Sequence, residues 1–110
     1  MADATGNSAV IEYVDKKLVT TKNSKNYQVV TNFTLYQNPT YNGFGKDRYE
    51  NIESELSKRN GIISETQALD LLKKNVIPGD EQWSVVYNLT KRNLKVTFSG
   101  DYNIIYQYDL

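Results

Sequence analysis

The sequence contains no cysteine and no histidine among its 110 residues. Without cysteine the chain has no disulfide framework, no thiolate nucleophile and no cysteine-ligated metal. Without histidine it has no imidazole base and no ordinary zinc site. We therefore expect neither a cofactor nor a bound metal, and much familiar enzyme chemistry is excluded before any motif is considered.

Net charge and long apolar runs are missing as well. Lys and Arg number 13, and so do Asp and Glu, whereas a dedicated nucleic-acid binder normally carries a basic stripe or a high isoelectric point. No stretch approaches the roughly 18 apolar residues that a transmembrane helix needs. Residues 1–7 lack the basic region and apolar run of a signal peptide. We expect no nucleic-acid partner, no membrane partner and a cytoplasmic location.

The chain has modest material for a hydrophobic core. Its length suits a single domain over residues 1–110. Hydrophobic residues make up 39%, and nine of them are tyrosines with a polar tip, against a usual level of about 45–50% in a tally that also counts glycine. Two interpretations fit: a small, marginally stable autonomous domain, or part of a larger domain whose remaining apolar surface lies on another chain.

The first third of the chain is β-prone. Residues 8–14 form a short strand-like run, and residues 18–21 can pair back on it across a polar turn. Residues 27–35 are rich in Val, Thr, Phe and Tyr and indicate a third strand. Proline and glycine then punctuate residues 37–45, which predicts a loop.

Two amphipathic helices follow. Apolar residues recur at helical spacing over 47–59, with Asp47 available as the N-terminal cap and Asn60-Gly61 as the stop. Residues 64–76 open with Ser64-Glu-Thr-Gln67, a capping box in which the Ser and Gln side chains satisfy free backbone amides. Each helix is expected to pack one face on a sheet.

The last third returns to strands, predicted at 83–89, 94–98 and 102–108. The order of strands, two helices and strands indicates an α+β architecture, in which an antiparallel sheet carries both helices on one face.

Generic catalytic motifs are weak. Gly43-Phe44-Gly45 lacks the further residues of a phosphate-binding loop. Glu50, Glu53 and Glu55 are interpreted as a solvated helix face. The tyrosines could form a stacking surface for sugars or bases, but they are spread over several elements, which favours half-buried strand residues.

A stronger signal comes from several segments taken in order. ADATGNSAVIEY opens the chain at 2–13, VVTNF at 29–33 precedes GKDRY at 45–49, and QWSVVYN at 82–88 is followed by DYNIIYQYDL at 101–110. This ordered set resembles the C-terminal portion of the choloylglycine hydrolase family. That family of linear-amide hydrolases includes bile salt hydrolases and penicillin V acylases, with acid ceramidase-like amidases as relatives.

The resemblance implies the C-terminal half of an N-terminal nucleophile hydrolase, an αββα sandwich. In that family the catalyst is an N-terminal Cys thiol, a strong nucleophile once it is ionised. An Asn after a strand positions the substrate carbonyl and the oxyanion, and an Arg at the start of the next helix lies near the nucleophile. The matching residues are Asn32 and Arg48.

The residues alone leave other roles open for these positions. Asn32 at a strand end could be a turn or capping residue, and Arg48 could form a surface ion pair with Glu50 or Asp47. Asp3 is expected to make a turn before the first strand.

The chain also departs from the family, since it has no Cys and removal of Met1 would expose Ala2. We expect the C-terminal piece of such a hydrolase, inactive by itself. Its expected partner is the N-terminal half of the same hydrolase or a second copy, with a small-molecule amide as substrate only when the site is completed. The alternative is a stand-alone, non-catalytic α+β binding or interaction module with its tyrosine-rich strands as the contact surface.

Overall fold

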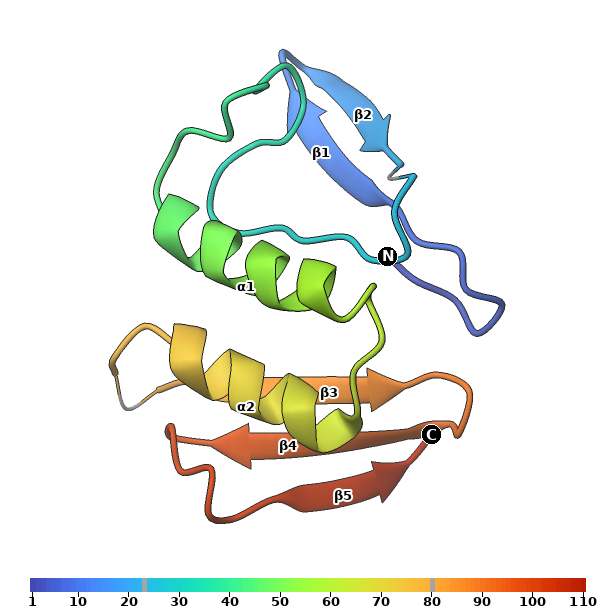
Figure 1. The fold of residues 1–110 in the computed structure, drawn as a ribbon, viewed down its shortest axis with the longest axis vertical. Helices are drawn as coiled ribbons and strands as arrows, with labels where there is room; N and C mark the ends of the chain where they lie inside the picture. The colour runs from blue at the N-terminus through green and yellow to red at the C-terminus, as the bar shows by residue number, and fades with distance from the viewer. Residues whose placement is uncertain (23, 80) are drawn as a thin grey trace. The chain divides into compact units, whose positions relative to one another are not determined.

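The computed structural model describes residues 1–22, 24–79 and 81–110. The chain divides into two compact units, Met1–Ile62 and Ile63–Leu110, and each is described by itself (Figure 1). Within the described residues lie a two-stranded sheet, a three-stranded sheet and two helices, which confirms the α+β class. The strands are thus distributed over two sheets. In this part of the chain, no helix has the length and apolar composition of a membrane span.

The first unit opens with the predicted hairpin. Strand β1 (Val10–Val14) pairs antiparallel with β2 (Lys17–Thr21). Between them Asp15 and Lys16 both have positive φ, 50° and 62°. Two consecutive left-handed residues are the signature of a tight hairpin turn whose twist matches that of the strands.

The third strand predicted at 27–35 is not formed. No residue of this segment belongs to a sheet of the described structure, because strand propensity is realised only where a neighbouring strand supplies the ladder. The segment is tied to the hairpin by a side chain instead. The Glu12 carboxylate accepts the backbone N–H of Leu35 at 2.7 Å and that of Tyr36 at 2.9 Å.

Helix α1 (Lys46–Lys58) closes the first unit. Its N-cap is Gly45, which has φ 85° and offers no side-chain cap, so the prediction of Asp47 as the cap is wrong; Asp47 lies in the first turn. The predicted stop is confirmed, since the Gly61 N–H donates to the Leu56 carbonyl at 2.8 Å and closes the last turn.

Helix α2 (Glu65–Asn75) opens the second unit on the predicted capping box. The Gln67 N–H donates to Ser64 Oγ at 3.2 Å, and the Ser64 N–H donates to Gln67 Oε1 at 2.9 Å. Both contacts satisfy amides that the first turn would otherwise leave free.

Three antiparallel strands follow in the spatial order β3-β4-β5: β3 (Trp83–Asn88), β4 (Asn93–Phe98) and β5 (Tyr106–Asp109). The first two match the predicted strands closely. The third begins four residues later than predicted, because Tyr102 and Asp101 are engaged elsewhere. The Tyr102 and Ser84 hydroxyls share a hydrogen bond of 2.7 Å, and Asp101 Oδ1 accepts the Asn103 N–H at 2.9 Å.

The two faces of this sheet differ in chemistry. Helix α2 lies over one of them (Figure 1), where Asn88 and Lys95 contact Glu65. The register places apolar side chains alone on the opposite face. We call it the aromatic face; it consists of Trp83, Val85, Tyr87, Leu94, Val96, Phe98, Tyr106 and Tyr108.

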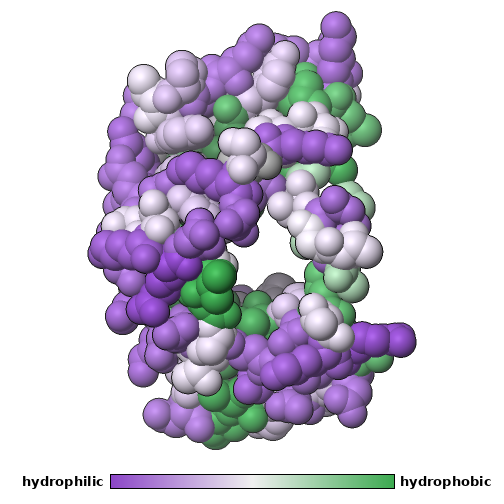
Figure 2. Space-filling view, turned by 45° about the vertical axis from the view of Figure 1, so that its right-hand side comes forward, coloured by the Kyte–Doolittle hydropathy of each residue, from purple (hydrophilic) through white to green (hydrophobic). Residues whose placement is uncertain are grey.

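Few apolar side chains are buried. In the described part of the chain they are Val29, Leu69 and Val96, whereas Trp83 is 69% exposed. Apolar residues accordingly reach the surface in patches among hydrophilic ones (Figure 2). Each unit therefore encloses a small core and leaves much apolar surface in contact with water.

Candidate functional site

Asn32 and Arg48, the two residues matched to the family motif, lie in direct contact. Arg48 Nη2 donates a hydrogen bond of 2.6 Å to Asn32 Oδ1 across sixteen positions of sequence. The contact joins the irregular segment 27–35 to the first turn of α1. Arg48 therefore points to Asn32, while Glu50 Oε1 lies 3.7 Å from Lys46 Nζ.

Gly45 leaves the room that the Arg48 guanidinium occupies. A Cβ at this position would lie 2.5 Å from Arg48 Nη2. The Gly45 carbonyl also accepts a hydrogen bond from Thr31 Oγ1 at 3.1 Å, which anchors the residue before Asn32 to the helix N-terminus. The guanidinium lies 5.6 Å from the Phe44 ring centre, a cation–π distance.

The contact fixes the orientation of the Asn32 amide. Because a guanidinium has only N–H donors, it must face the amide oxygen, and the Nδ2 group with its two donors is turned away. Within the described residues Nδ2 makes no protein hydrogen bond. The guanidinium of arginine is a planar cation with several N–H donors. The pair can therefore offer an oriented N–H donor beside a fixed cation, which suits a carbonyl oxygen that gains negative charge.

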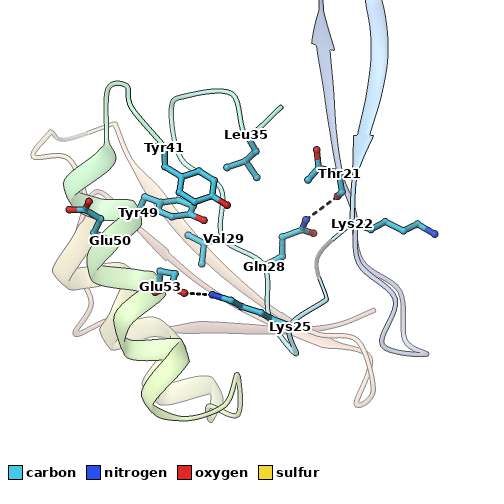
Figure 3. Close-up of a pocket in the computed structure, with 10 residues that line it drawn as sticks. All are labelled: Thr21, Lys22, Lys25, Gln28, Val29, Leu35, Tyr41, Tyr49, Glu50 and Glu53. Atoms are coloured by element: carbon cyan, nitrogen blue, oxygen red, sulfur yellow. Dashed lines mark hydrogen bonds and ion pairs between the residues drawn. The ribbon is translucent and has the colours of Figure 1, made fainter. Parts of the chain in front are cut away.

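The sequence predicts that Glu50, Glu53 and Glu55 form a solvated face of α1. The structure agrees with this only in part. Glu53 Oε1 accepts a hydrogen bond from Lys25 Nζ (Figure 3) and another from the Tyr27 hydroxyl. The hydrogen bond from Lys25 holds the pKa of the Glu53 carboxyl below its ordinary value, and the same contact raises the pKa of Lys25. Glu55 does face outward, where it pairs with Lys58 at 2.8 Å.

A cavity of about 470 Å³ lies beside this ion pair within the first unit (Figure 3). Tyr41 and Tyr49 stack along one side of it, with ring centres 5.0 Å apart and planes inclined by 28°. Burial, followed by the neighbouring Tyr41, raises the pKa of Tyr49. Sequence reasoning assigned the tyrosines to half-buried strands and missed this pair, which comes from a loop and a helix. The lining residues are Thr21, Lys22, Lys25, Gln28, Val29, Leu35, Tyr41, Tyr49, Glu50 and Glu53.

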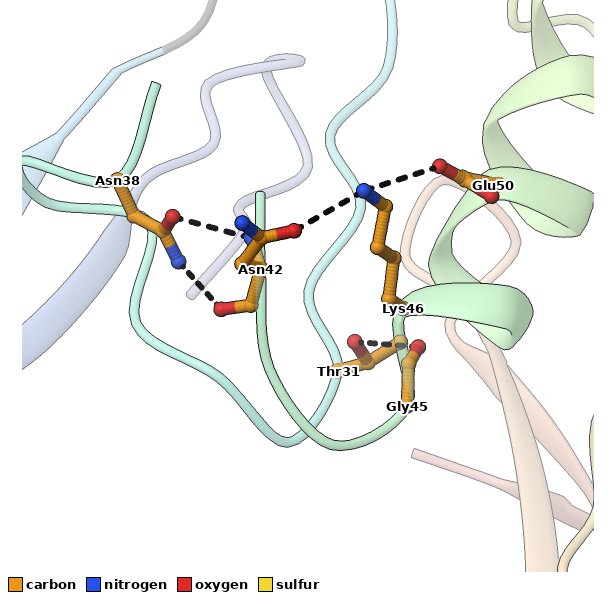
Figure 4. A network of polar contacts seen from close by, with 6 residues as sticks. All are labelled: Thr31, Asn38, Asn42, Gly45, Lys46 and Glu50. Atoms are coloured by element: carbon orange, nitrogen blue, oxygen red, sulfur yellow. Dashed lines mark hydrogen bonds and ion pairs between the residues drawn. The ribbon is translucent and has the colours of Figure 1, made fainter. Parts of the chain in front are cut away.

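The loop that carries Tyr41 is held by amide side chains (Figure 4). Asn38 Nδ2 donates to the Asn42 carbonyl at 2.8 Å, and the Asn42 N–H donates back to Asn38 Oδ1 at 3.0 Å. Lys46 Nζ donates to Asn42 Oδ1 at 3.0 Å and so ties the loop to α1. This network holds Tyr41 at φ 48°, a conformation that bulky residues rarely adopt.

Two further carboxylates have structural surroundings. Asp3 Oδ1 accepts the backbone N–H groups of Thr5 and Asn7 at 2.9 and 3.1 Å, which is the predicted turn, and hydrogen bonds led by the Asn7 side chain hold the pKa of Asp3 well below its usual range. In the second unit Lys95 and Asn88 both donate to Glu65, and they lower the pKa of Glu65 to about 2.

In the described ranges 1–22, 24–79 and 81–110, no group of three or more Asp or Glu residues is placed to hold a metal ion. Comparison of the chain with protein-family models, with curated proteins and with solved structures finds no match.

Proposed function

We propose that this chain is the C-terminal part of a linear-amide hydrolase of the choloylglycine hydrolase type, with Asn32 and Arg48 at its reaction centre. The observation that supports this most directly is the 2.6 Å hydrogen bond between them. The family motifs mark these two residues sixteen positions apart, and a shared reaction centre requires that they meet.

In this proposal the two side chains have different tasks. A thiol attacks the carbonyl carbon of a linear amide, and negative charge develops on the carbonyl oxygen. Asn32 Nδ2 donates a hydrogen bond to that oxygen, a type of contact whose loss costs about 10²–10³ in rate. Arg48 holds the Asn32 amide in orientation, and its charge favours the ionised thiol.

The nucleophile must come from elsewhere, because this sequence contains no Cys. The chain by itself is therefore inactive and acts on a small-molecule amide only when a first-half chain with an N-terminal Cys completes the site. A cytoplasmic location belongs to the same proposal.

The aromatic face supports the need for such a partner. Five of its aromatic side chains are each at least 46% exposed. Since a buried aromatic side chain covers about 150–250 Å², the exposed part of these five amounts to roughly 500 Å². The largest apolar patch of a typical monomer covers about 300–600 Å² and is often functional, and a stable interface takes about 800 Å² from each partner.

The direct test is to co-express this chain with the first half of a choloylglycine-type hydrolase that exposes an N-terminal Cys. Purified pairs are assayed for amine release from bile-acid, phenoxyacetyl and fatty-acyl amides. We expect activity in the pair and in neither chain alone. Asn32→Ala should lower kcat/KM by about 10²–10³. The control Asn26→Ala removes an exposed amide of the same unit, bonded to Asn60 at 3.3 Å, and should leave the rate unchanged.

A pair that forms but retains full activity in Asn32→Ala would contradict the assigned role. Failure of the halves to associate would favour the second candidate, a stand-alone α+β interaction module. The observation on its side is the exposure of Tyr87, Tyr106 and Tyr108, at 59%, 46% and 53%, which places tyrosine-rich strands at the surface.

A further inference from the structure

We propose that the cavity in the first unit is a binding site for a small, uncharged aromatic molecule with a hydrogen-bond donor, of the size of phenol or indole. Neither Asn32 nor Arg48 lines this cavity. The proposal is therefore independent of amide hydrolysis, and the two can fail separately.

The size of the cavity fits this class of ligand. Its volume is about 470 Å³. An apolar cavity of about 150 Å³ is enough to hold benzene, and small-molecule sites span about 300–1,000 Å³. One or two fused rings can therefore enter together with a few water molecules.

One side of the cavity is a platform for a flat ring. The stacked rings of Tyr41 and Tyr49 lie beside the side chains of Val29 and Leu35 (Figure 3). Val29 is one of the few buried apolar residues in the described ranges, at 7% exposure. A flat apolar ligand gains both area burial and ring contacts on such a wall.

The charges near the cavity cancel. Lys25 and Glu53 pair with each other at its edge. Figure 3 shows the Lys22 and Glu50 side chains directed away from the two tyrosine rings, and Glu50 lies 3.7 Å from Lys46. An anion or a cation would lose its hydration here without gaining a counter-charge of its own, so the site favours a neutral ligand.

The polar side of the cavity offers a hydrogen-bond acceptor. Gln28 Nε2 donates to the Thr21 carbonyl at 3.0 Å, which fixes the amide and leaves Gln28 Oε1 to accept. In Figure 3 the hydroxyl ends of Tyr41 and Tyr49 point toward the side of the cavity where Gln28 lies. A ligand with an N–H or O–H group therefore meets oxygen atoms opposite the ring platform.

The platform is also held in place before any ligand arrives. Tyr41 has φ 48°, and the Asn38–Asn42–Lys46 network fixes its loop (Figure 4). Strained residues that a hydrogen-bond network holds in place are typical of ligand-binding sites. A preformed wall loses less conformational entropy on binding than a mobile one does.

The test is a ¹H–¹⁵N NMR titration of the 110-residue chain with indole. We expect saturable shifts of the amides of Val29, Tyr41 and Tyr49, with a dissociation constant on the order of 1 mM, as befits so small a ligand. Benzoate and benzylamine, which carry a charge on a similar ring, should bind at least about tenfold more weakly.

Substitutions test whether indole binds on the stacked rings of Tyr41 and Tyr49. Tyr41→Ala should weaken indole binding about tenfold, since ring stacking is lost, while Tyr41→Phe keeps the ring and should bind nearly as the parent chain does. The matched control is Tyr13→Ala, which removes a 70% exposed tyrosine of β1 and should have no effect. If Tyr41→Ala disturbs the loop, Gln28→Leu provides a second test of the site. It should weaken the binding of indole and leave the binding of toluene, which has no hydrogen-bond donor, unchanged.

Three results would overturn the proposal. One is the absence of saturable shifts at these residues. Another is equal binding of benzoate or benzylamine, which would refute the neutral class. The third is a set of shifts confined to Trp83, Phe98 and Tyr106, which would show that indole merely adheres to the aromatic face of the other unit.

Discussion

At the scale of single residues, Gly45 governs the candidate site although it has no side chain. Replacing it with Ala adds a Cβ 2.5 Å from Arg48 Nη2 at a residue with φ 85°. We expect Gly45→Ala to cost about 1–2 kcal/mol of unfolding free energy for the left-handed backbone alone, and to displace the guanidinium from Asn32. Urea unfolding measures the cost, and the NMR shift of the Asn32 side-chain amide reports the displacement.

Gly6→Ala separates these two effects. Gly6 lies in the same unit at φ 90°, and a Cβ there meets nothing within 4 Å. This variant should carry the backbone cost without any change at Asn32. An Asn32 amide signal that stays in place in Gly45→Ala would mean that the Arg48 contact does not depend on the space that Gly45 leaves.

The lowered pKa of Glu65 predicts that the stability of the second unit depends on pH. Its pKa of about 2 lies below the ordinary value of 4.5, because Lys95 and Asn88 donate to the carboxylate. The ionised group stabilises the folded unit above pH 4.5, and this contribution is lost as the pH falls from 4.5 toward 2. The difference in unfolding free energy between the parent and Glu65→Gln should therefore be largest near neutral pH and close by about pH 2.

Urea unfolding followed by circular dichroism at several pH values measures that difference. Glu81→Gln, at an exposed position of the same unit, is the control and should follow the parent across the range. If Glu65→Gln were still less stable than the parent by the same amount at pH 2, its effect would come from the shape of the new side chain and not from the lost charge.

At the scale of elements, the capping box of α2 should contribute measurably to stability. Ser64→Ala removes the oxygen that accepts the Gln67 N–H and should cost about 1 kcal/mol, measured by chemical denaturation. Ser54→Ala, at an exposed position in the middle of α1, is the counterpart and should be neutral or slightly stabilising, because Ala favours a helix interior. Equal effects of the two changes would argue against the cap.

Elements set by neighbouring residues were predictable from the sequence. The hairpin, both helices, the capping box and strands β3 and β4 follow from periodicity, turn chemistry and caps that lie within a few positions of one another. Segment 27–35 has the composition of a strand, but its state depends on whether another strand lies beside it. Similarly, β5 starts at Tyr106 and not at Tyr102. The Tyr102 hydroxyl instead shares a hydrogen bond with the hydroxyl of Ser84, which lies eighteen positions earlier in the same unit.

The same distinction applies to the candidate site. Asn32 and Arg48 were marked by a family resemblance, and no local pattern indicated that Arg48 would contact Asn32 rather than Glu50. The cavity was missed entirely, because Gln28, Tyr41 and Tyr49 come from separate segments that only the tertiary structure brings together. Glu53 looked solvated for the same reason, since its partner Lys25 lies 28 positions away.

At the scale of the whole molecule, the aromatic face should promote self-association in the absence of a partner. Tyr106→Lys places a charge on that face and should shift the chain toward monomer in sedimentation velocity, because burying an unpaired charge opposes the contact. Gln107→Lys places the same charge one residue along, on the opposite face, and should not. Monomeric behaviour of the parent chain at high concentration would contradict this prediction.

The division of the chain into two units bears on the expectation that the chain is part of a larger hydrolase. Each unit has its own small core, with Val29 in the first and Leu69 and Val96 in the second. A single domain over 1–110 stays a prediction. A surface supplied by another chain would add the apolar contacts that both units lack, which agrees with the incomplete hydrolase proposed above.

Trp83 is the sole tryptophan of the sequence, and it stands on the aromatic face with 69% of its surface exposed. Tryptophan emits at shorter wavelengths as its surroundings become less polar. The fluorescence of Trp83 therefore reports on the surface where a partner is expected. Docking there should shift its emission to shorter wavelengths, which can be measured without an attached dye.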